Sequence, residues 1–312
     1  MIVLIHSNER YGDNPAMTTN VPVRSNEPES KTARAPLIDA IAASDGVELV
    51  SYRWPAAGEP RATVALVHGL AEHAGRYQAL AASLNAAGIE LVSLDLRGHG
   101  RSPGERAWVE RFDHYLLDAE ALLGVAAREP TPLFLMGHSM GGTIAALYAL
   151  ERPMPPGHTL AGLILSSPAL APGRDVPRWM IAASRFISRV WPRFPAMKID
   201  AALLARDAAV VADNRADALV HHGPVPARTG AEILAAMERI EARRATLSVP
   251  VLVFHGTADK LTEPEGSRDF AAHAGSEDRT LALYEGSYHE SMNDLDRERV
   301  IGDLIRWIEA RI

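Results

Sequence analysis

The sequence predicts an α/β fold built on a mostly parallel sheet with helices on both faces. Short β-rich runs alternate along the chain with longer Ala- and Leu-rich segments, an alternation typical of such sheets. The chain has 312 residues, of which 47% are hydrophobic, which is enough for one large α/β unit carrying an insertion. Between Pro168 and Ser248 the alternation stops, and helical periodicity interrupted by prolines replaces it.

The elements expected in the sheet layer follow in a regular order. Leu49–Trp54 alternates with a period of two, which predicts a half-exposed strand. The β-rich runs Thr63–His68 and Ile89–Leu94 flank a helical segment, Tyr77–Ala87, that Gly88 ends. The remaining elements are, in chain order, a helix, a strand, a helix, three strands and a closing helix: Phe112–Arg128, Pro132–Met136, Gly141–Leu150, Leu160–Ser166, Val249–Phe254, Thr280–Tyr284 and Arg297–Ile312.

The segment after Pro168 shows no strand pattern, and we interpret residues 168–247 as a helical cap. Ligands of open parallel sheets bind beyond the carboxyl ends of the strands, where such an insertion can form a roof. Residues 36–167 and 248–312 are then the core. Residues 1–35, largely polar and without periodicity, are expected to form a disordered tail, and translation can start at Met1 or Met17.

Composition excludes several classes of protein. The chain has no cysteine, which excludes disulfides, thiolate nucleophiles and Cys-ligated metal centres. Its net charge of −7 provides no overall attraction for phosphates, so we expect no nucleic-acid partner. No apolar run approaches the roughly 18 residues of a membrane span, and the short apolar start lacks the features of a signal peptide. We therefore expect a soluble, cytoplasmic protein.

The strongest functional signal is Gly137-His138-Ser139-Met140-Gly141, between a predicted strand and a predicted helix. The pattern G-x-S-x-G in that context is a nucleophile elbow, a turn so tight that small residues must stand two positions from the serine on each side. Such a turn exposes the Ser139 hydroxyl at a helix N-terminus, where the dipole favours developing negative charge. The alternative is a glycine-rich turn with an idle serine.

A serine nucleophile needs a base and an acid that orients it, and in this fold class they follow in the order Ser, Asp or Glu, His. Asp259 follows the strand Val249–Phe254, and His289 follows the last predicted strand. Acyl transfer also needs donors for the oxyanion. We expect these to be the backbone N–H groups of Met140, next to the nucleophile, and of Leu70, in the loop after Thr63–His68.

Other acids and histidines receive structural interpretations. Asp95 precedes Ser139 and so breaks the expected order of the triad. We expect His255 to be packed, His99 to lie in a structural loop and His138 to point away from the site. In the insertion, the adjacent pair His221 and His222 is a weak candidate for a metal site. Asp213 and Asp217 are expected to face solvent. We therefore predict no metal and no organic cofactor.

Three motifs together resemble the monoacylglycerol lipase and lysophospholipase branch of the α/β-hydrolases: HGLAEHAGRY at 68–77, GHSMGG at 137–142 and YEGSYH at 284–289. The resemblance runs from about Val47 to the C-terminus. It implies an eight-stranded, largely parallel sheet with a helical cap. It also implies a triad of Ser139, Asp259 and His289 and oxyanion donors at Leu70 and Met140. Glu72 and Arg76 match family positions near the glycerol end of the substrate, with a loop-stabilising ion pair as the alternative.

The predicted cap carries an apolar stripe at near-helical spacing: Trp179, Ala183, Phe186, Val190 and Phe194. This stripe either lines an acyl-binding groove or packs the cap onto the core. Residues 172–195 also carry five arginines against one aspartate, which predicts either a transient contact with a membrane or micelle surface or a solvated face.

We expect a serine hydrolase of carboxylic esters, with monoacylglycerols as the first candidate substrate and an acyl-enzyme on Ser139. Other single-chain or xenobiotic esters, cleaved by a general carboxylesterase or a lysophospholipase, and acyl transfer to an alcohol are the alternatives within this class. A binding module that has lost catalysis is the alternative outside it. Chain-length preference, regioselectivity and oligomeric state stay open.

Overall fold

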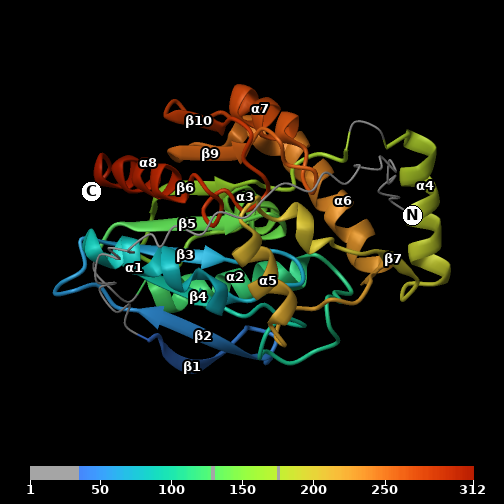
Figure 1. Ribbon diagram of the computed structural model, residues 1–312, viewed down its shortest axis with the longest axis horizontal. Helices are drawn as coiled ribbons and strands as arrows, with labels where there is room; N and C mark the ends of the chain where they lie inside the picture. The colour runs from blue at the N-terminus through green and yellow to red at the C-terminus, as the bar shows by residue number, and fades with distance from the viewer. Residues whose placement is uncertain (1–34, 128–130, 174–175) are drawn as a thin grey trace, which may run out of the picture.

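An eight-stranded sheet runs through the centre of the molecule (Figure 1). It is seen in a computed structural model that describes residues 35–127, 131–173 and 176–312. The strand order is β1-β2-β4-β3-β5-β6-β9-β10. Strand β2 runs in the opposite direction to the other seven strands, which are parallel to one another. The eight strands are β1 (Leu37–Ala42), β2 (Glu48–Trp54), β3 (Ala62–Val67), β4 (Ile89–Leu94), β5 (Leu133–His138), β6 (Leu160–Ser166), β9 (Val251–Gly256) and β10 (Arg279–Tyr284). The predicted fold class is confirmed. The tail expected at 1–35 lies, except for its last residue, outside the described residues.

Helices cover both faces of the sheet, so the central strands are buried on both sides. One face packs on α2 (Asp113–Ala126), α3 (Met140–Glu151) and α7 (Pro264–His273). The other face packs on α1 (Gln78–Ala86) and α8 (Arg297–Glu309), preceded by the 3-10 turn η1 (Ala74–Tyr77). All six residues of β3, β4, β5 and β9 are buried, which explains why these strands appear in the sequence as continuous apolar runs.

The segment between β6 and β9, residues 168–247, is called the cap segment below. Its helices are α4 (Arg178–Val190), α5 (Ala208–Ala216) and α6 (Ala227–Arg243), and its 3-10 turns are η2 (Ala201–Leu203) and, at its end, η3 (Arg244–Thr246). In Figure 1, α4 and α6 lie at the right, beyond the arrowheads of the parallel strands. The expectation of no strand here was wrong, because β7 (Pro195–Met197) pairs antiparallel with β8 (Val225–Pro226). Strands of two or three residues are too short to show a period.

Strand β1 was also not predicted. It is an edge strand, five of its six residues are exposed, and so its sequence shows no alternation between buried and exposed positions. Of the residues that the structure describes, none belongs to a helix long and apolar enough to cross a membrane.

The end of β9 and the loop before His289 touch through their backbones. A Cβ atom built on Gly256 would lie 2.3 Å from the carbonyl oxygens of Ser287 and Tyr288. Such a contact cannot be accommodated without moving backbone, so Gly256 sets the position of the loop.

We predict that Gly256→Ala lowers the free energy of unfolding by about 2 kcal/mol or more, the range of overpacking in a closely packed interior. Gly124→Ala is the matched control, because its Cβ meets nothing within 4 Å on helix α2. That substitution is expected to stabilise by about 0.5 kcal/mol. Urea unfolding of both variants measures the difference, and equal stabilities would contradict the close contact.

Candidate active site

Ser139 stands in a strained turn between β5 and α3. Its φ is 54° and its ψ −120°, a left-handed conformation that is rare outside glycine. A Cβ on Gly137 would lie 2.1 Å from the carbonyl oxygen of Gly141, and one on Gly141 would lie 2.1 Å from that of Val67. The turn therefore requires glycine on both sides of the serine. These are the strand, turn and helix that the G-x-S-x-G pattern predicted.

His289 and Asp259 meet at the carboxyl ends of β10 and β9. His289 Nδ1 lies 2.7 Å from Asp259 Oδ2, and both side chains are buried. The other carboxylate oxygen, Oδ1, accepts hydrogen bonds from the backbone N–H groups of Leu261 (2.7 Å) and Thr262 (3.1 Å). The carboxylate is thus fixed at both oxygens, and the imidazole is oriented by one of them.

These contacts set the charge of both groups. Burial alone lowers the pKa of His289, but the Asp259 carboxylate outweighs it and raises that pKa above its usual 6.5. Burial alone raises the pKa of Asp259, but His289 and His255 outweigh it and hold the pKa well below its usual value. Asp259 is therefore ionised at neutral pH.

A pocket of about 200 Å³ brings the candidate residues together. Ser139, His289, Leu70 and Met140 all line it. A Cβ on Gly69 would lie 3.2 Å from the Cβ of Ser139, so the loop after β3 passes directly beside the serine. Because Met140 is the first residue of α3, its N–H has no partner within the helix. The loop after β3 and the start of α3 thus border one space next to Ser139.

Glu72 and Arg76 line the same pocket and form an ion pair at 2.9 Å, which is the contact proposed as the structural alternative. Glu72 is held further by the N–H of Gly69 (2.6 Å) and the hydroxyl of Tyr77 (2.8 Å). Burial alone would raise the pKa of Glu72, but Arg76, His138 and His68 hold it at about 2. Both functions proposed for this pair are therefore compatible with its position.

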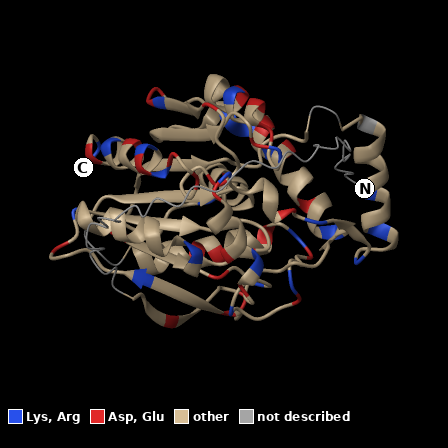
Figure 2. Ribbon diagram, viewed as in Figure 1, with Lys and Arg blue, Asp and Glu red and all other residues tan. Residues whose placement is uncertain are grey.

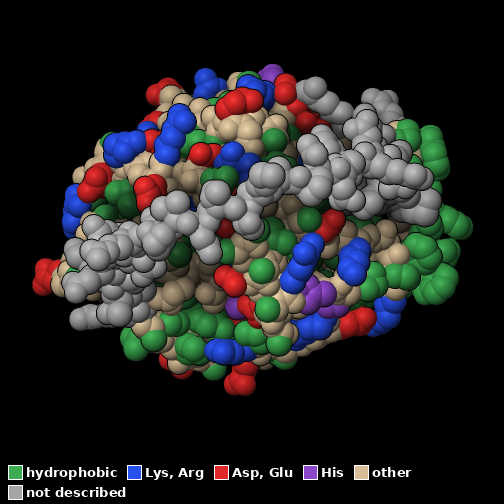
Figure 3. All heavy atoms as spheres, in the orientation of Figure 1, with side chains coloured by type: hydrophobic (Ala, Val, Ile, Leu, Met, Phe, Trp, Pro, Cys, Tyr) green, Lys and Arg blue, Asp and Glu red, His purple; other side chains and the backbone are tan. Residues whose placement is uncertain are grey.

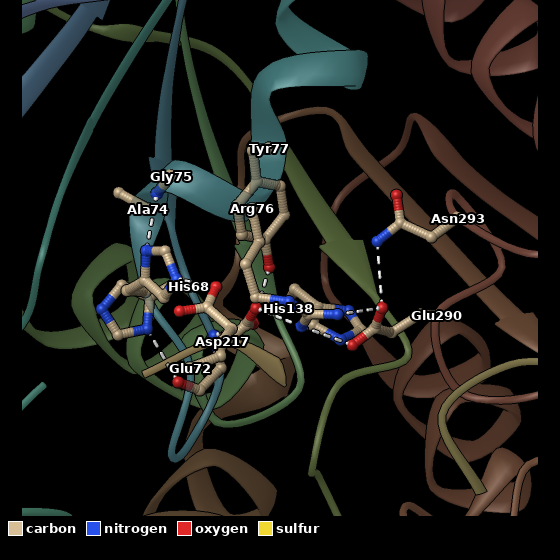
Figure 4. Close-up of polar contacts among 12 residues, drawn as sticks. His68, Glu72, Ala74, Gly75, Arg76, Tyr77, His138, Asp217, Glu290 and Asn293 are labelled. Atoms are coloured by element: carbon tan, nitrogen blue, oxygen red, sulfur yellow. Dashed lines mark hydrogen bonds and ion pairs between the residues drawn. The ribbon is translucent and has the colours of Figure 1, made fainter. Parts of the chain in front are cut away.

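Glu290 was not predicted from the sequence. Arg76 binds it through two nitrogens, at 2.6 and 2.8 Å, and Asn293 donates to it at 3.0 Å (Figure 4). Glu290 is buried and lines the pocket. The pair ties the loop after β3 to the loop that carries His289. The only signal in the sequence was an acidic residue directly after the candidate base.

Two interpretations of single residues were wrong. His138 does not point away from the site: its ring centroid lies 4.7 Å from that of His289, and it lines the pocket. Burial and the neighbouring His289 lower its pKa to about 4, so it is neutral. Asp217 does not simply face solvent, because it lies 2.8 Å from Nε2 of His73, a pair that tethers the cap segment to the core. Both contacts join segments far apart in the sequence, which local patterns do not reveal.

The other acids and histidines considered from the sequence have the following environments. Asp95 is structural, accepting from Ala74 N, Arg101 N and the Tyr52 hydroxyl. His99 is buried in its loop, and Asp213 is exposed. His255 is packed as expected, but its partner is Asp259. His221 and His222 line the pocket mouth, and within the described ranges no group of three or more His, Asp or Glu side chains could hold a metal ion.

The apolar stripe predicted on α4 does not line an acyl-binding groove, which was one of its two interpretations. Trp179, Phe186 and Val190 are 68%, 66% and 64% exposed, and the face of α4 turned inward carries the buried Ser184 and Ser188. The apolar wall of the pocket comes instead from α6 and the start of the cap segment, with Ala169, Ala171, Ile233, Leu234 and Met237.

Comparison with known proteins gives one family. The family model Hydrolase_4, described as serine aminopeptidase S33, matches residues 58–296. A monoacylglycerol lipase of Mycolicibacterium smegmatis is 36% identical over 269 residues, which cover 86% of this chain and 95% of the relative. Human monoglyceride lipase is 33% identical, covering 86% and 89%. The crystal structure of Paleococcus ferrophilus monoacylglycerol lipase superposes with a TM-score of 0.74 at 31% identity, covering 85% and 100%.

The pKa directions predict how activity depends on pH. His289 accepts a proton only when neutral, and Asp259 raises its pKa, so kcat/KM is expected to fall with decreasing pH through a midpoint above 6.5. Asp259→Asn removes the charge, which moves that midpoint down and lowers kcat by about 10³-fold or more. Hydrolysis of a soluble p-nitrophenyl ester from pH 5 to 9 measures both. A wild-type midpoint below 6.5 would contradict the assigned pair.

Proposed function

Since the chain belongs to the Hydrolase_4 family of α/β-hydrolases and is a carboxylic ester hydrolase, we propose that it cleaves monoacylglycerols to glycerol and a fatty acid. The proposal extends to its architecture: residues 168–247 are a cap over a core formed by 36–167 and 248–312. The observation that carries the proposal is the pocket in which Ser139 and His289 meet an apolar wall and charged side chains.

The chemistry proceeds through an acyl-enzyme. The Ser139 hydroxyl attacks the ester carbonyl while His289 takes its proton, and Asp259 holds the imidazole with its proton on Nδ1. The backbone N–H groups of Leu70 and Met140 stabilise the tetrahedral oxyanion. His289 then protonates the leaving glycerol oxygen and afterwards activates the water that releases the fatty acid. None of these steps requires a metal or an organic cofactor.

The lining of the pocket suits both parts of a monoacylglycerol. The side chains of Ile233, Leu234 and Met237 offer an apolar wall to a single acyl chain. The carboxylates of Glu72 and Glu290, which line the same pocket, can accept hydrogen bonds from glycerol hydroxyls, while Arg76 is already engaged by both. Names of the relatives support the same substrate.

We predict that the protein hydrolyses 1-monoacylglycerols from C8 to C18 with a chain-length optimum. Ser139→Ala should lose this activity by several orders of magnitude, about 10⁴-fold or more, because the nucleophile is absent. Released fatty acid is the measurement, and circular dichroism of the variant shows that it is folded.

Substrate panels separate the alternatives. Serine-dependent cleavage of p-nitrophenyl acetate without cleavage of any monoacylglycerol would support a general carboxylesterase. Faster cleavage of lysophospholipids than of monoacylglycerols would support a lysophospholipase. Wild-type turnover in Ser139→Ala would contradict the mechanism itself.

We also propose that α4 contacts the lipid surface that holds the substrate. Figure 3 shows hydrophobic side chains gathered at the right edge, where α4 lies, and Trp191 at its end is 60% exposed. Exposed aromatic side chains of this size are suited to the interface between water and lipid. Basic residues lie on and just after this helix (Figure 2), but Arg185 on α4 pairs with Glu238, and Arg193, three residues after α4, pairs with Glu105. We therefore expect the apolar side chains to supply most of the affinity.

The double variant Trp179→Ser and Phe186→Ser is expected to lower partitioning onto phosphatidylglycerol-containing vesicles by about tenfold or more, because two exposed apolar side chains no longer insert. Turnover of a soluble ester should not change. Leu37→Ser is the control, since Leu37 is 62% exposed on the edge strand β1, away from α4 (Figure 1). Equal loss of vesicle binding in the control would contradict a specific role of α4.

A further inference from the structure

A second histidine contacts the candidate triad carboxylate, and the mechanism above gives it no role. His255, in β9, is fully buried, and its Nε2 lies 2.9 Å from Asp259 Oδ2. The carboxylate side chain is itself fully buried. In such a dry environment a hydrogen bond to a charged group is strong, and an imidazole there does not serve merely to fill space.

The neighbours of His255 fix its tautomer. An ionised Asp259 can only accept, so Nε2 of His255 must carry the proton. On the other side of the ring, Nδ1 lies 2.7 Å from the hydroxyl oxygen of Ser267, a buried residue of α7 that can donate its proton to Nδ1. The hydrogen bonds then run from the Ser267 hydroxyl to His255 and from His255 to Asp259. The Ser267 hydroxyl, from a separate helix, thus matches the tautomer that the carboxylate requires.

Oδ2 of Asp259 is the oxygen that faces His289, and it is shared. It accepts from His289 Nδ1 at 2.7 Å and from His255 Nε2 at 2.9 Å. The Thr262 hydroxyl lies 2.8 Å from it and shares its one proton between this oxygen and the Ser167 carbonyl at 3.0 Å. Each additional donor withdraws negative charge from that oxygen. The hold of Asp259 on the His289 proton is therefore weaker than that of a carboxylate with one partner.

We propose that His255 is a positioning residue of the hydrolase reaction: it fixes Oδ2 toward His289 and limits how strongly that oxygen binds the imidazole proton. The inference rests on the proposed triad. Without His255, Oδ2 carries more charge and stabilises the protonated form of His289, so the base is active only at higher pH.

The other charged or titratable groups around His289 are unchanged when His255 is substituted. They are Glu72 from the loop after β3, His138 from β5 and Glu290 beside His289 itself, with Arg76 bound between the two glutamates. None of them contacts His255 in a hydrogen bond of the described structure. The groups that connect His255 to His289 are Asp259 and the Thr262 hydroxyl, which lies 3.2 Å from a ring nitrogen of each histidine and itself contacts Asp259.

The test is the pH profile of kcat/KM for a soluble p-nitrophenyl ester with His255→Leu and His255→Gln. We expect His255→Leu to lower kcat/KM at pH 7 by about tenfold to a hundredfold, the loss typical of a hydrogen bond to a charged group. Its acid limb should move up by about half a pH unit or more. His255→Gln should restore most of both, since its side-chain N–H can donate to Asp259.

Two controls separate this role from packing. His99→Leu removes another buried histidine, whose Nδ1 contacts the carbonyl of Arg97, and should leave the acid limb unchanged. If His255→Leu does not fold, His255→Phe keeps an aromatic ring in the same space without a donor to Asp259, and the acid limb should still move up. A folded His255→Leu or His255→Phe with the wild-type limb would overturn the inference. The proposed function fails separately, through ester turnover that survives Ser139→Ala.

Discussion

The site depends on backbone segments that approach too closely for any side chain between them. Gly137 and Gly141 let β5 turn into α3 against the carbonyl of Val67, and Gly256 lets the end of β9 touch the loop before His289. These contacts place three loops from distant parts of the chain around one space. The strained φ of Ser139 persists because packing on both sides of the turn leaves no alternative conformation.

Buried polar contacts then hold those loops at fixed distances. Arg76 joins Glu72 to Glu290, so the loop after β3 and the loop after β10 move as one. The cap segment is tied to the same loops, since the N–H of His221 donates to the Ala71 carbonyl at 2.8 Å and the N–H of Glu290 donates to that of Leu204 at 2.7 Å. Fixed dipoles of this kind do not have to reorganise when charge develops, which is how such a site lowers a barrier.

Patterns within the sequence predicted the parts of the fold that depend on local chemistry. The bounds of Ile89–Leu94 match β4 fully, and the strand, turn and helix at Ser139 follow from the glycines that the turn requires. Edge strand β1 was not predicted because its residues are exposed on both sides. Strands β7 and β8 were not predicted because they are too short to show a period. The family resemblance supplied the strand count of eight, which the sheet confirms.

Long-range contacts of single side chains were beyond sequence reasoning. Glu290, the pair of Asp217 with His73 and the approach of His138 to His289 each join segments that only the folded chain brings together. The orientation of α4 failed for a related reason. An apolar stripe predicts burial, but here the helix turns Ser184, Ser188 and the partly buried Ile181 inward and presents its large aromatic side chains outward.

The central claim is an acyl-enzyme on Ser139. The most direct test is to quench the protein with acid during turnover of a monoacylglycerol and to measure the masses of the intact chain and of its peptides by mass spectrometry. The account predicts a mass increase equal to one acyl group, located on the peptide that contains Ser139 and absent in Ser139→Ala. An acyl group on another residue, or rapid turnover with a trapped adduct in Ser139→Ala, would contradict it.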